Sequence, residues 1–315
     1  MKYGIIGVGA VGGYYGGLLA KNGFDVHFLF HSDYLYVKKN GLFIDSKDGD
    51  YHLSRVNAYS KAEDMPLCDI VIVALKTTEN YQLPAMLPHI IKDTGIIIIL
   101  QNGLGVEKEI AKMVPSASIL GGLCFLCSNK VGQGHIKHID YGSVIIGEYL
   151  QEYRPSGITE NLKLIADLFK SAGISVQLSD NLGLARWKKL VWNIPFNGLS
   201  VILDATTDQL MESPSTRCLA ENVMREVITG AKHCGFFMEK EYADDMLKLT
   251  EQMAAYKPSM KLDFEAGRPM EIEKIYSQPV YESASAGYDM VCARTICLQL
   301  EYLDMQTGFN RSDSH

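Results

Sequence analysis

The sequence predicts an α/β protein in which a doubly wound, mainly parallel sheet is followed by an all-helical carboxy-terminal domain. Two observations support this fold class. Short apolar runs alternate with helical stretches as far as about residue 178, and longer helical patterns without strand-like runs follow. Strands separated by helices form a parallel sheet through right-handed crossovers. We therefore expect one domain at residues 1–178 and a second at residues 179–315.

The first element is a strand, a tight turn and a helix. The apolar run at residues 3–6 leads into the sequence GVGAVG, and a helix-compatible stretch at residues 14–21 ends at Asn-Gly. In such a setting Gly7 permits the turn, Gly9 lets the backbone approach a pyrophosphate, and Gly12 allows close contact between helix and strand. The pattern predicts a Rossmann-type dinucleotide-binding turn, with a purely structural glycine turn as the alternative. The residues assigned to the nucleotide are Gly7, Val8, Gly9, Ala10, Val11 and Gly12.

The later elements follow from the hydrophobic pattern. Nearly continuous apolar runs are typical of strands that are buried on both faces. The expected strands are 25–30, 68–75, 96–100, 118–127, 143–147 and 174–178. The clearest expected helices of the second domain are 219–234 and 243–255.

Composition excludes several classes of function. The net charge of -7 gives no electrostatic case for nucleic-acid binding. No apolar run reaches the roughly 18 residues that span a bilayer, so we expect no membrane association and a cytoplasmic location. The seven cysteines are scattered through 315 residues and are expected to be reduced thiols.

The end of the second strand bears on the choice between NADP and NAD. An acidic residue there binds the ribose hydroxyls of NAD, whereas a basic residue accommodates the 2′-phosphate of NADP. His31 occupies the position of the phosphate ligand, and Asp33 falls beyond the strand end. Histidine carries only part of a positive charge near neutral pH. The pattern favours NADPH and leaves NADH open.

Four further segments occur in a fixed order along the chain: LKT at 75–77, QNGLG at 101–105, ARWKKLVWNIPFN at 185–197 and SMKLDFEAGRPMEIE at 259–273. Together with the glycine turn, they make the chain resemble the ketopantoate reductase family over essentially its whole length. The resemblance implies an NADPH-dependent reduction of 2-dehydropantoate to (R)-pantoate, in the synthesis of pantothenate and coenzyme A. It also implies a cofactor on the amino-terminal sheet and a small 2-keto acid between the domains.

The resemblance assigns the catalytic roles to Lys189 and Glu271. Lys189, rather than Lys188, matches the catalytic acid of the family. An ammonium group within hydrogen-bonding reach of a ketone can stabilise the negative charge that hydride delivery leaves on oxygen, and can donate the proton. Glu271 matches the acidic residue that binds the substrate hydroxyl. Taken alone, each would be a solvated helix residue.

The remaining site residues are expected on helices and at strand ends. Asn193 and Asn197 lie four residues apart and share a helix face with Lys189, although Pro195 interrupts the pattern. By resemblance both asparagines are substrate ligands and Ser259 contacts the substrate carboxylate. Asn102 and Lys76 follow expected strands at the sheet edge where ligands bind. By resemblance Asn102 borders the nicotinamide and the substrate, and Lys76 lines the same cleft.

Two alternative functions remain. A related reductase could act on another 2-keto acid, and a non-catalytic dinucleotide sensor could share the same glycine turn. The residues Cys124, Cys127, His135 and His138 imitate a zinc site, but the stretch between the pairs is too short for a zinc finger, so no metal is expected. A homodimer through a face of the helical domain is compatible with the sequence.

Overall fold

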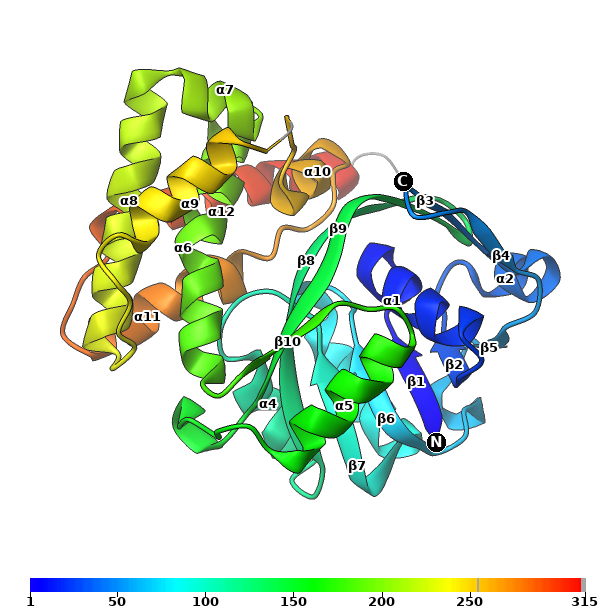
Figure 1. Ribbon diagram of the computed structural model, residues 1–315. Coiled ribbons are helices and arrows are strands. Elements are labelled where there is room, and N and C mark those ends of the chain that lie inside the picture. The colour runs from blue at the N-terminus through cyan, green and yellow to red at the C-terminus, as the bar shows by residue number, and fades with distance from the viewer. Residues whose placement is uncertain (254, 313–315) are drawn as a thin grey trace. The chain divides into compact units, whose positions relative to one another are not determined.

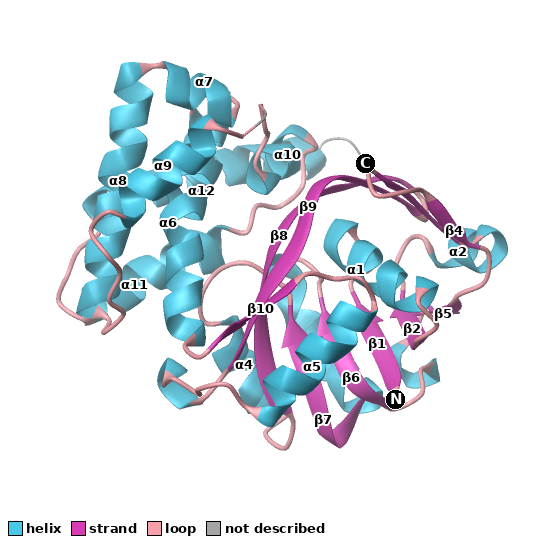
Figure 2. Ribbon diagram, in the orientation of Figure 1, coloured by secondary structure: helices cyan, strands magenta, loops and turns pink. Residues whose placement is uncertain are grey.

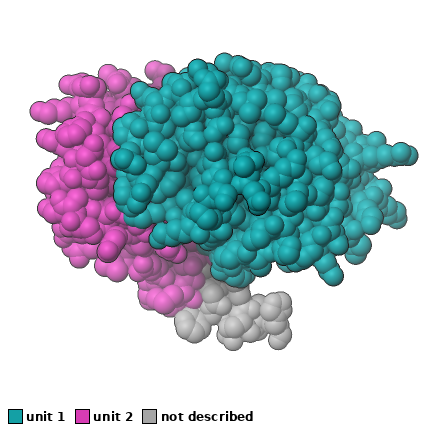
Figure 3. Space-filling model, turned by 90° about the horizontal axis from the view of Figure 1, so that it is seen from below, with its two compact units in different colours: residues 1–101, 106–182 teal, residues 102–105, 183–315 magenta. Residues whose placement is uncertain are grey.

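The computed structural model describes residues 1–253 and 255–312. The chain divides into two compact units, shown in different colours in Figure 3. Unit 1 comprises residues 1–101 and 106–182. Unit 2 comprises the short segment 102–105 together with the described residues from 183 onward. The chain therefore enters unit 2 twice.

Unit 1 is built on one mixed sheet with the strand order β4-β3-β9-β8-β7-β6-β1-β2-β5, in which β10 also pairs with β9 (Figure 2). All pairs are parallel except β3 with β4 and β8 with β9. The strands are β1 (Lys2–Ile6), β2 (Asp25–Leu29), β3 (Leu42–Ser46), β4 (Tyr51–Leu53), β5 (Asn57–Tyr59), β6 (Cys68–Val73), β7 (Ile91–Ile99), β8 (Ser118–Gly132), β9 (His135–Glu148) and β10 (Val176–Ser179).

Helices cover both faces of this sheet, as a doubly wound fold requires. Helices α1 (Ala10–Lys21) and α5 (Glu160–Ser171) share one core with alternate strand residues such as Ile5. Helices α3 (Leu83–Ile90) and α4 (Val106–Met113) share a second core with the intervening residues such as Ile6. Figure 1 shows α1 and α5 on the same side of the strands. The apolar runs of β1 and β6 are therefore continuous because both of their faces are buried.

The remaining elements of unit 1 are short. Helix α2 (Tyr34–Asn40) follows β2 and leads into β3. Single 3₁₀ turns lie at Ala62–Asp64, Thr77–Gln82 and Gln151–Tyr153.

The structure corrects the expected strands in one region. Residues 118–127 and 143–147 are parts of β8 and β9, which form one long antiparallel hairpin. The outer part of this hairpin alternates polar and apolar residues and is partly exposed, so it lacks a continuous apolar run. Strands β3, β4 and β5 were not expected because they are short and only partly buried.

All regular secondary structure in the described residues of unit 2 is helical. Its elements are α6 (Leu182–Ile202), α7 (Thr207–Glu212), α8 (Pro214–His233), α9 (Tyr242–Glu251), α10 (Ser259–Glu265), a π-helical turn η4 (Glu273–Ser277), α11 (Gln278–Ser285) and α12 (Val291–Ser312). The expected helix 219–234 lies in α8, which ends one residue earlier. The expected helix 243–255 is too long, because α9 ends at Glu251; Ala254 lies outside the described residues.

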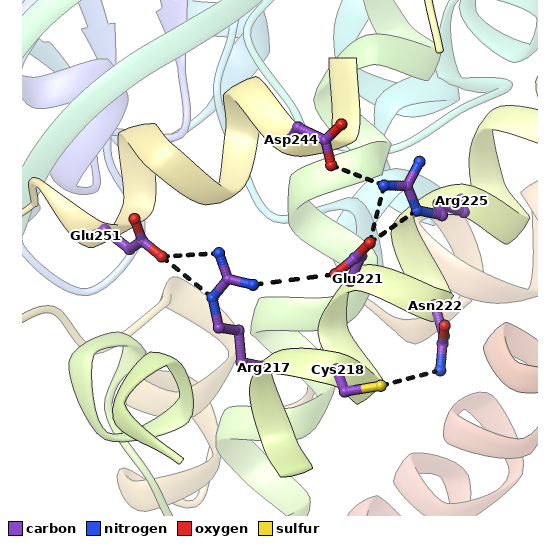
Figure 4. A network of polar contacts seen from close by, with 7 residues as sticks. All are labelled: Arg217, Cys218, Glu221, Asn222, Arg225, Asp244 and Glu251. Atoms are coloured by element: carbon purple, nitrogen blue, oxygen red, sulfur yellow. Dashed lines mark hydrogen bonds and ion pairs between the residues drawn. The ribbon is translucent and has the colours of Figure 1, made fainter. Parts of the chain in front are cut away.

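A surface network of ion pairs joins α8 to α9 (Figure 4). Arg217 and Arg225 of α8 contact Glu251 and Asp244 of α9 at 2.9 and 2.7 Å, and Arg225 also contacts Glu221 at 2.8 Å. Exposed pairs contribute at most about 1 kcal/mol each, so this network orients α9 more than it stabilises the fold.

Candidate functional site

The glycine turn of unit 1 has the geometry that a pyrophosphate needs. Gly7 has a φ of +90°, and a Cβ there would lie 2.2 Å from the backbone nitrogen of Leu75. A Cβ on Gly12 would lie 2.2 Å from the Gly7 carbonyl oxygen, whereas one on Gly9 would meet nothing within 4 Å. Gly9 is the N-cap of α1 and makes no side-chain capping hydrogen bond. The turn is therefore tightly packed at Gly7 and Gly12, where helix and strand meet. It has open space at Gly9, where an anion would approach the first backbone N–H groups of α1.

Two other sequence-predicted residues of unit 1 lie after parallel strands. His31 is exposed just beyond the end of β2. Lys76 is the N-cap of the 3₁₀ turn that follows β6 and is half-buried. Parallel strands of such sheets carry their ligands at their carboxyl ends, so both positions are compatible with the nucleotide.

Helix α6 of unit 2 carries Lys189, Asn193 and Asn197. The helix continues through Pro195, so it does not begin at the proline. Lys189 is half-buried, whereas Asn193 and Asn197 are buried. Next to the proline, the Tyr276 hydroxyl donates a 2.7 Å hydrogen bond to the Ile194 carbonyl. Complete burial raises the pKa of Tyr276 well above its usual value, which keeps this hydroxyl a donor.

Asn197 joins α6 to α10. Its side-chain oxygen accepts a 3.2 Å hydrogen bond from the backbone N–H of Met260, in the first turn of α10. Ser259, immediately before Met260, is the first residue of this helix and is half-buried. In the same helix, the buried Lys261 forms an ion pair with Asp204, which follows α6. Asn197 thus fixes the backbone next to Ser259.

Glu271 and Asn102 belong to two segments that touch. Glu271 is 5% exposed and lies two residues before the π-helical turn η4. The N–H of Leu104 donates a 2.9 Å hydrogen bond to the carbonyl of Lys274 in that turn. Gly103 has a φ of +92°, and a Cβ there would lie 2.4 Å from the same carbonyl oxygen. The QNGLG segment therefore requires glycine at 103 in order to pack on the residues after Glu271.

These contacts bring two segments of unit 2 to the middle of α6 and a third segment to η4. The segment after Glu271 reaches Ile194 through Tyr276, α10 reaches Asn197 through Met260, and residues 102–105 reach η4 through Leu104. The positioning residue Tyr276 was missed at the sequence level, because nothing in the pattern of residues 271–278 links it to α6. A π-helical turn is frequent at functional sites, but it has no sequence signature here.

We expect Asn197→Ala to loosen α10 and to raise the KM for substrate. The Met260 N–H would lose its acceptor in a buried place, which costs about 1–3 kcal/mol. Urea unfolding gives the loss of stability, and steady-state kinetics give KM. Asn222→Ala is the matched control, since Asn222 is an exposed asparagine on α8. A variant at 197 that behaves like this control would contradict the role of Asn197.

The residues of the zinc-like pattern have other neighbours. His135 contacts Asp45 at 2.8 Å, and the buried His138 is bonded to Ser46 and to the Tyr141 carbonyl. Within the residues that the structure describes, no three His, Cys, Asp or Glu side chains are grouped so that they could hold a metal ion. All seven cysteines are thiols, as expected. None of the described helices is both long and apolar enough to span a membrane.

The glycine turn on a doubly wound sheet, followed by a helical unit with a cluster of polar side chains, defines a two-domain oxidoreductase of the dinucleotide-binding class. The models for ketopantoate reductase PanE/ApbA and for its C-terminal domain match residues 3–151 and 181–301. The chain belongs to the ketopantoate reductase family, as its sequence resemblance predicted.

Individual relatives agree with this assignment. The chain is 50% identical over 311 residues to a 2-dehydropantoate 2-reductase of Nostoc sp., covering 99% of this chain and 97% of that protein. The crystal structure of 2-dehydropantoate 2-reductase from Geobacter metallireducens has a TM-score of 0.90 at 38% identity, over 97% and 99% of the two chains. A D-mandelate dehydrogenase solved with NADH and anilino(oxo)acetate shares the fold, with a TM-score of 0.85 at 22% identity over 98% and 100% of the chains.

Proposed function

We propose that this protein reduces the ketone of 2-dehydropantoate to (R)-pantoate, with NADPH as the preferred reductant. The observation that carries the proposal is that α10, which begins at Ser259, and the segment after Glu271 both contact the middle of α6, at Asn197 and Ile194. The full-length similarity to a 2-dehydropantoate 2-reductase supports the same substrate. We further propose that residues 1–178 bind the nucleotide and that residues 179–315, with Asn102, bind the substrate.

The proposed chemistry assigns one task to each polar group. When bound, the reduced nicotinamide supplies the hydride that the ketone carbon accepts. The Lys189 ammonium donates a hydrogen bond to the ketone oxygen, stabilises its developing negative charge and gives it a proton. The Glu271 carboxylate accepts a hydrogen bond from the substrate hydroxyl and balances the ammonium charge.

The other side chains orient the substrate. Because the Asn197 side-chain oxygen is bonded to Met260, its NH₂ group is the part that donates to substrate oxygen. Asn193 and Ser259 supply further donors, with Ser259 on the substrate carboxylate. In unit 1, the open side of Gly9 and the neighbouring amides of α1 hold the pyrophosphate, and His31 and Lys76 add further nucleotide contacts. Asn102, which belongs to unit 2, is assigned to both nucleotide and substrate.

The test is nucleotide oxidation, followed optically, with 2-dehydropantoate and with NADPH or NADH. We expect turnover with both nucleotides and a higher kcat/KM with NADPH. 2-Ketoisovalerate, which lacks the substrate hydroxyl, serves as the matched substrate; it should react poorly because Glu271 loses its partner. Benzoylformate is included because the fold is shared with a D-mandelate dehydrogenase.

Each other outcome points to a different function. Higher kcat/KM on another keto acid would reassign the substrate within the family. Tight nucleotide binding without turnover on any keto acid would favour a dinucleotide sensor.

We also propose a cytoplasmic location, the compartment in which seven reduced thiols persist.

A further inference from the structure

Asp33, which follows β2, has a different environment in the structure from the one that its position in the sequence suggests. In dinucleotide-binding sheets, the end of the second strand faces the adenosine ribose, and an acidic residue about 20 positions after the glycines binds the hydroxyls of NAD. Asp33 has that spacing from the glycine turn. It is the N-cap residue of α2, but its side chain makes no capping hydrogen bond.

The Asp33 carboxylate is turned into unit 1 instead. It is 4% exposed and accepts hydrogen bonds from the Lys130 ammonium at 2.7 Å, the Gly134 N–H at 3.0 Å and the Ser32 hydroxyl at 3.1 Å. Burial alone would raise the pKa of Asp33, but the bonds from Lys130, Gly134 and Ser32 outweigh burial and lower it. The carboxylate is therefore an ion with both oxygens engaged, and a ribose hydroxyl would have to displace one of these donors.

The hairpin that supplies Lys130 and Gly134 is held firmly beside α2. Gly134, in the turn between β8 and β9, has a φ of +59°, and a Cβ there would lie 2.8 Å from the Val37 side chain. Its carbonyl accepts a 2.8 Å hydrogen bond from the Phe43 N–H. Lys130 at the end of β8 is thus placed by the backbone next to the residues that follow β2.

The ion pair of Lys130 and Asp33 has no net charge, but its two side chains differ in their exposure to solvent. The Asp33 side chain is 5% exposed, whereas that of Lys130 is 35% exposed. An ammonium group has three donors, and in the described part of the chain Asp33 is the only partner of this one. Together with the exposed His31, the outward side of this corner therefore presents nitrogen donors, while the Ser32 hydroxyl is used on Asp33. Such a set suits a dianionic phosphate better than a neutral ribose diol.

We propose that Lys130, oriented by the buried Asp33, binds the 2′-phosphate of NADP(H) and determines the preference of this chain for the phosphorylated nucleotide. The inference rests on the proposed nucleotide-dependent function. It gives Asp33 the opposite role from the one that its sequence position suggests. Asp33 is a positioning residue for a cation, and it does not bind ribose.

The test is isothermal titration calorimetry of NADP⁺ and NAD⁺ with the full-length protein, which needs no turnover. We expect Lys130→Met to weaken NADP⁺ binding about 10- to 100-fold, the loss of one charge-assisted hydrogen bond, and to leave NAD⁺ binding nearly unchanged. Adenosine 2′,5′-bisphosphate and 5′-AMP, titrated in the same way, isolate the ribose phosphate from the nicotinamide. Lys137→Met is the control, since Lys137 is an exposed lysine of the same hairpin, opposite Asn129.

A second variant distinguishes a loss of nucleotide binding from a folding defect. Lys130→Met leaves the Asp33 charge buried without its cation, which itself destabilises the fold. The double variant Asp33→Asn/Lys130→Met removes both charges and should show the same selective loss of NADP⁺ with a melting temperature near that of the parent. Equal weakening of both nucleotides, unchanged NADP⁺ affinity, or a parent protein that binds neither nucleotide would overturn the proposal. Selective NADP⁺ binding without keto acid turnover would leave it standing while removing the proposed function.

Discussion

Lys189→Ala is expected to lower kcat by about 10²- to 10⁴-fold, the usual contribution of a positioned proton donor. The reason is that the ketone oxygen loses both the charge that stabilises it and the proton that it takes up. The loss should appear in kcat at saturating nucleotide and substrate, with a melting temperature close to that of the parent. Stopped-flow mixing under single-turnover conditions would show that the hydride step itself is slowed.

Lys188→Ala is the matched control for this variant. Lys188 is the preceding residue of α6, and its ammonium lies 5.4 Å from the centre of the Tyr242 ring. Tyr242 is the first residue of α9 and is not one of the proposed site residues, so little change in kcat is expected. A small primary amine added to the Lys189→Ala protein should restore part of the activity. Full turnover of Lys189→Ala, or a larger loss at position 188, would show that the wrong lysine has been assigned.

The paired variants Gly7→Ala and Gly9→Ala are expected to fail in different ways. A methyl group at Gly7 would lie 2.2 Å from the Leu75 nitrogen, on a backbone with positive φ. Strain and overlap of this kind together cost roughly 2–5 kcal/mol, so Gly7→Ala should unfold at a clearly lower urea concentration. Gly9 has a φ of -92° and no atom within 4 Å of its would-be Cβ, so Gly9→Ala should fold normally.

The defect of Gly9→Ala should instead appear in nucleotide binding. Its methyl group would occupy the open side of the turn, where we expect the pyrophosphate, so the Kd for NADPH should rise by about tenfold or more. Fluorescence titration of NADPH measures this directly. A Gly9→Ala protein with parental affinity for NADPH would place the nucleotide elsewhere, whatever the stability of Gly7→Ala.

Much of unit 1 could be predicted from sequence because its central strands are buried on both faces. Runs such as CDIVIV in β6 and IIII in β7 have no other common explanation than buried parallel strands. The hairpin of β8 and β9 extends beyond this protected region. There, Lys137 lies between the buried Ile136 and His138, whereas the end of β8 around Lys130 has no buried residue, so the pattern is too weak to mark strand ends.

The site was only partly accessible to sequence reasoning for a related physical reason. The family motifs predict Lys189, Asn197 and Glu271 as site residues, and the four-residue spacing along α6 indicates one helix face. What positions them are contacts between distant segments, such as Asn197 with Met260 and Tyr276 with Ile194. The direction of the Asp33 side chain could not be predicted either. Its spacing from the glycines defines where its backbone lies, but not that its carboxylate binds Lys130.

The segment 102–105 has a consequence for how this molecule could be dissected. The helical half is assembled from two stretches of polypeptide, and the shorter one is supplied from within the amino-terminal half. A protein expressed from residue 183 onward would lack the Leu104 N–H that donates to the Lys274 carbonyl. The surface at Lys274 that Gly103 covers would then be exposed. Limited proteolysis or gene truncation at the boundary between the halves would therefore yield an incomplete module, and domain exchange with a relative would have to carry this tetrapeptide along.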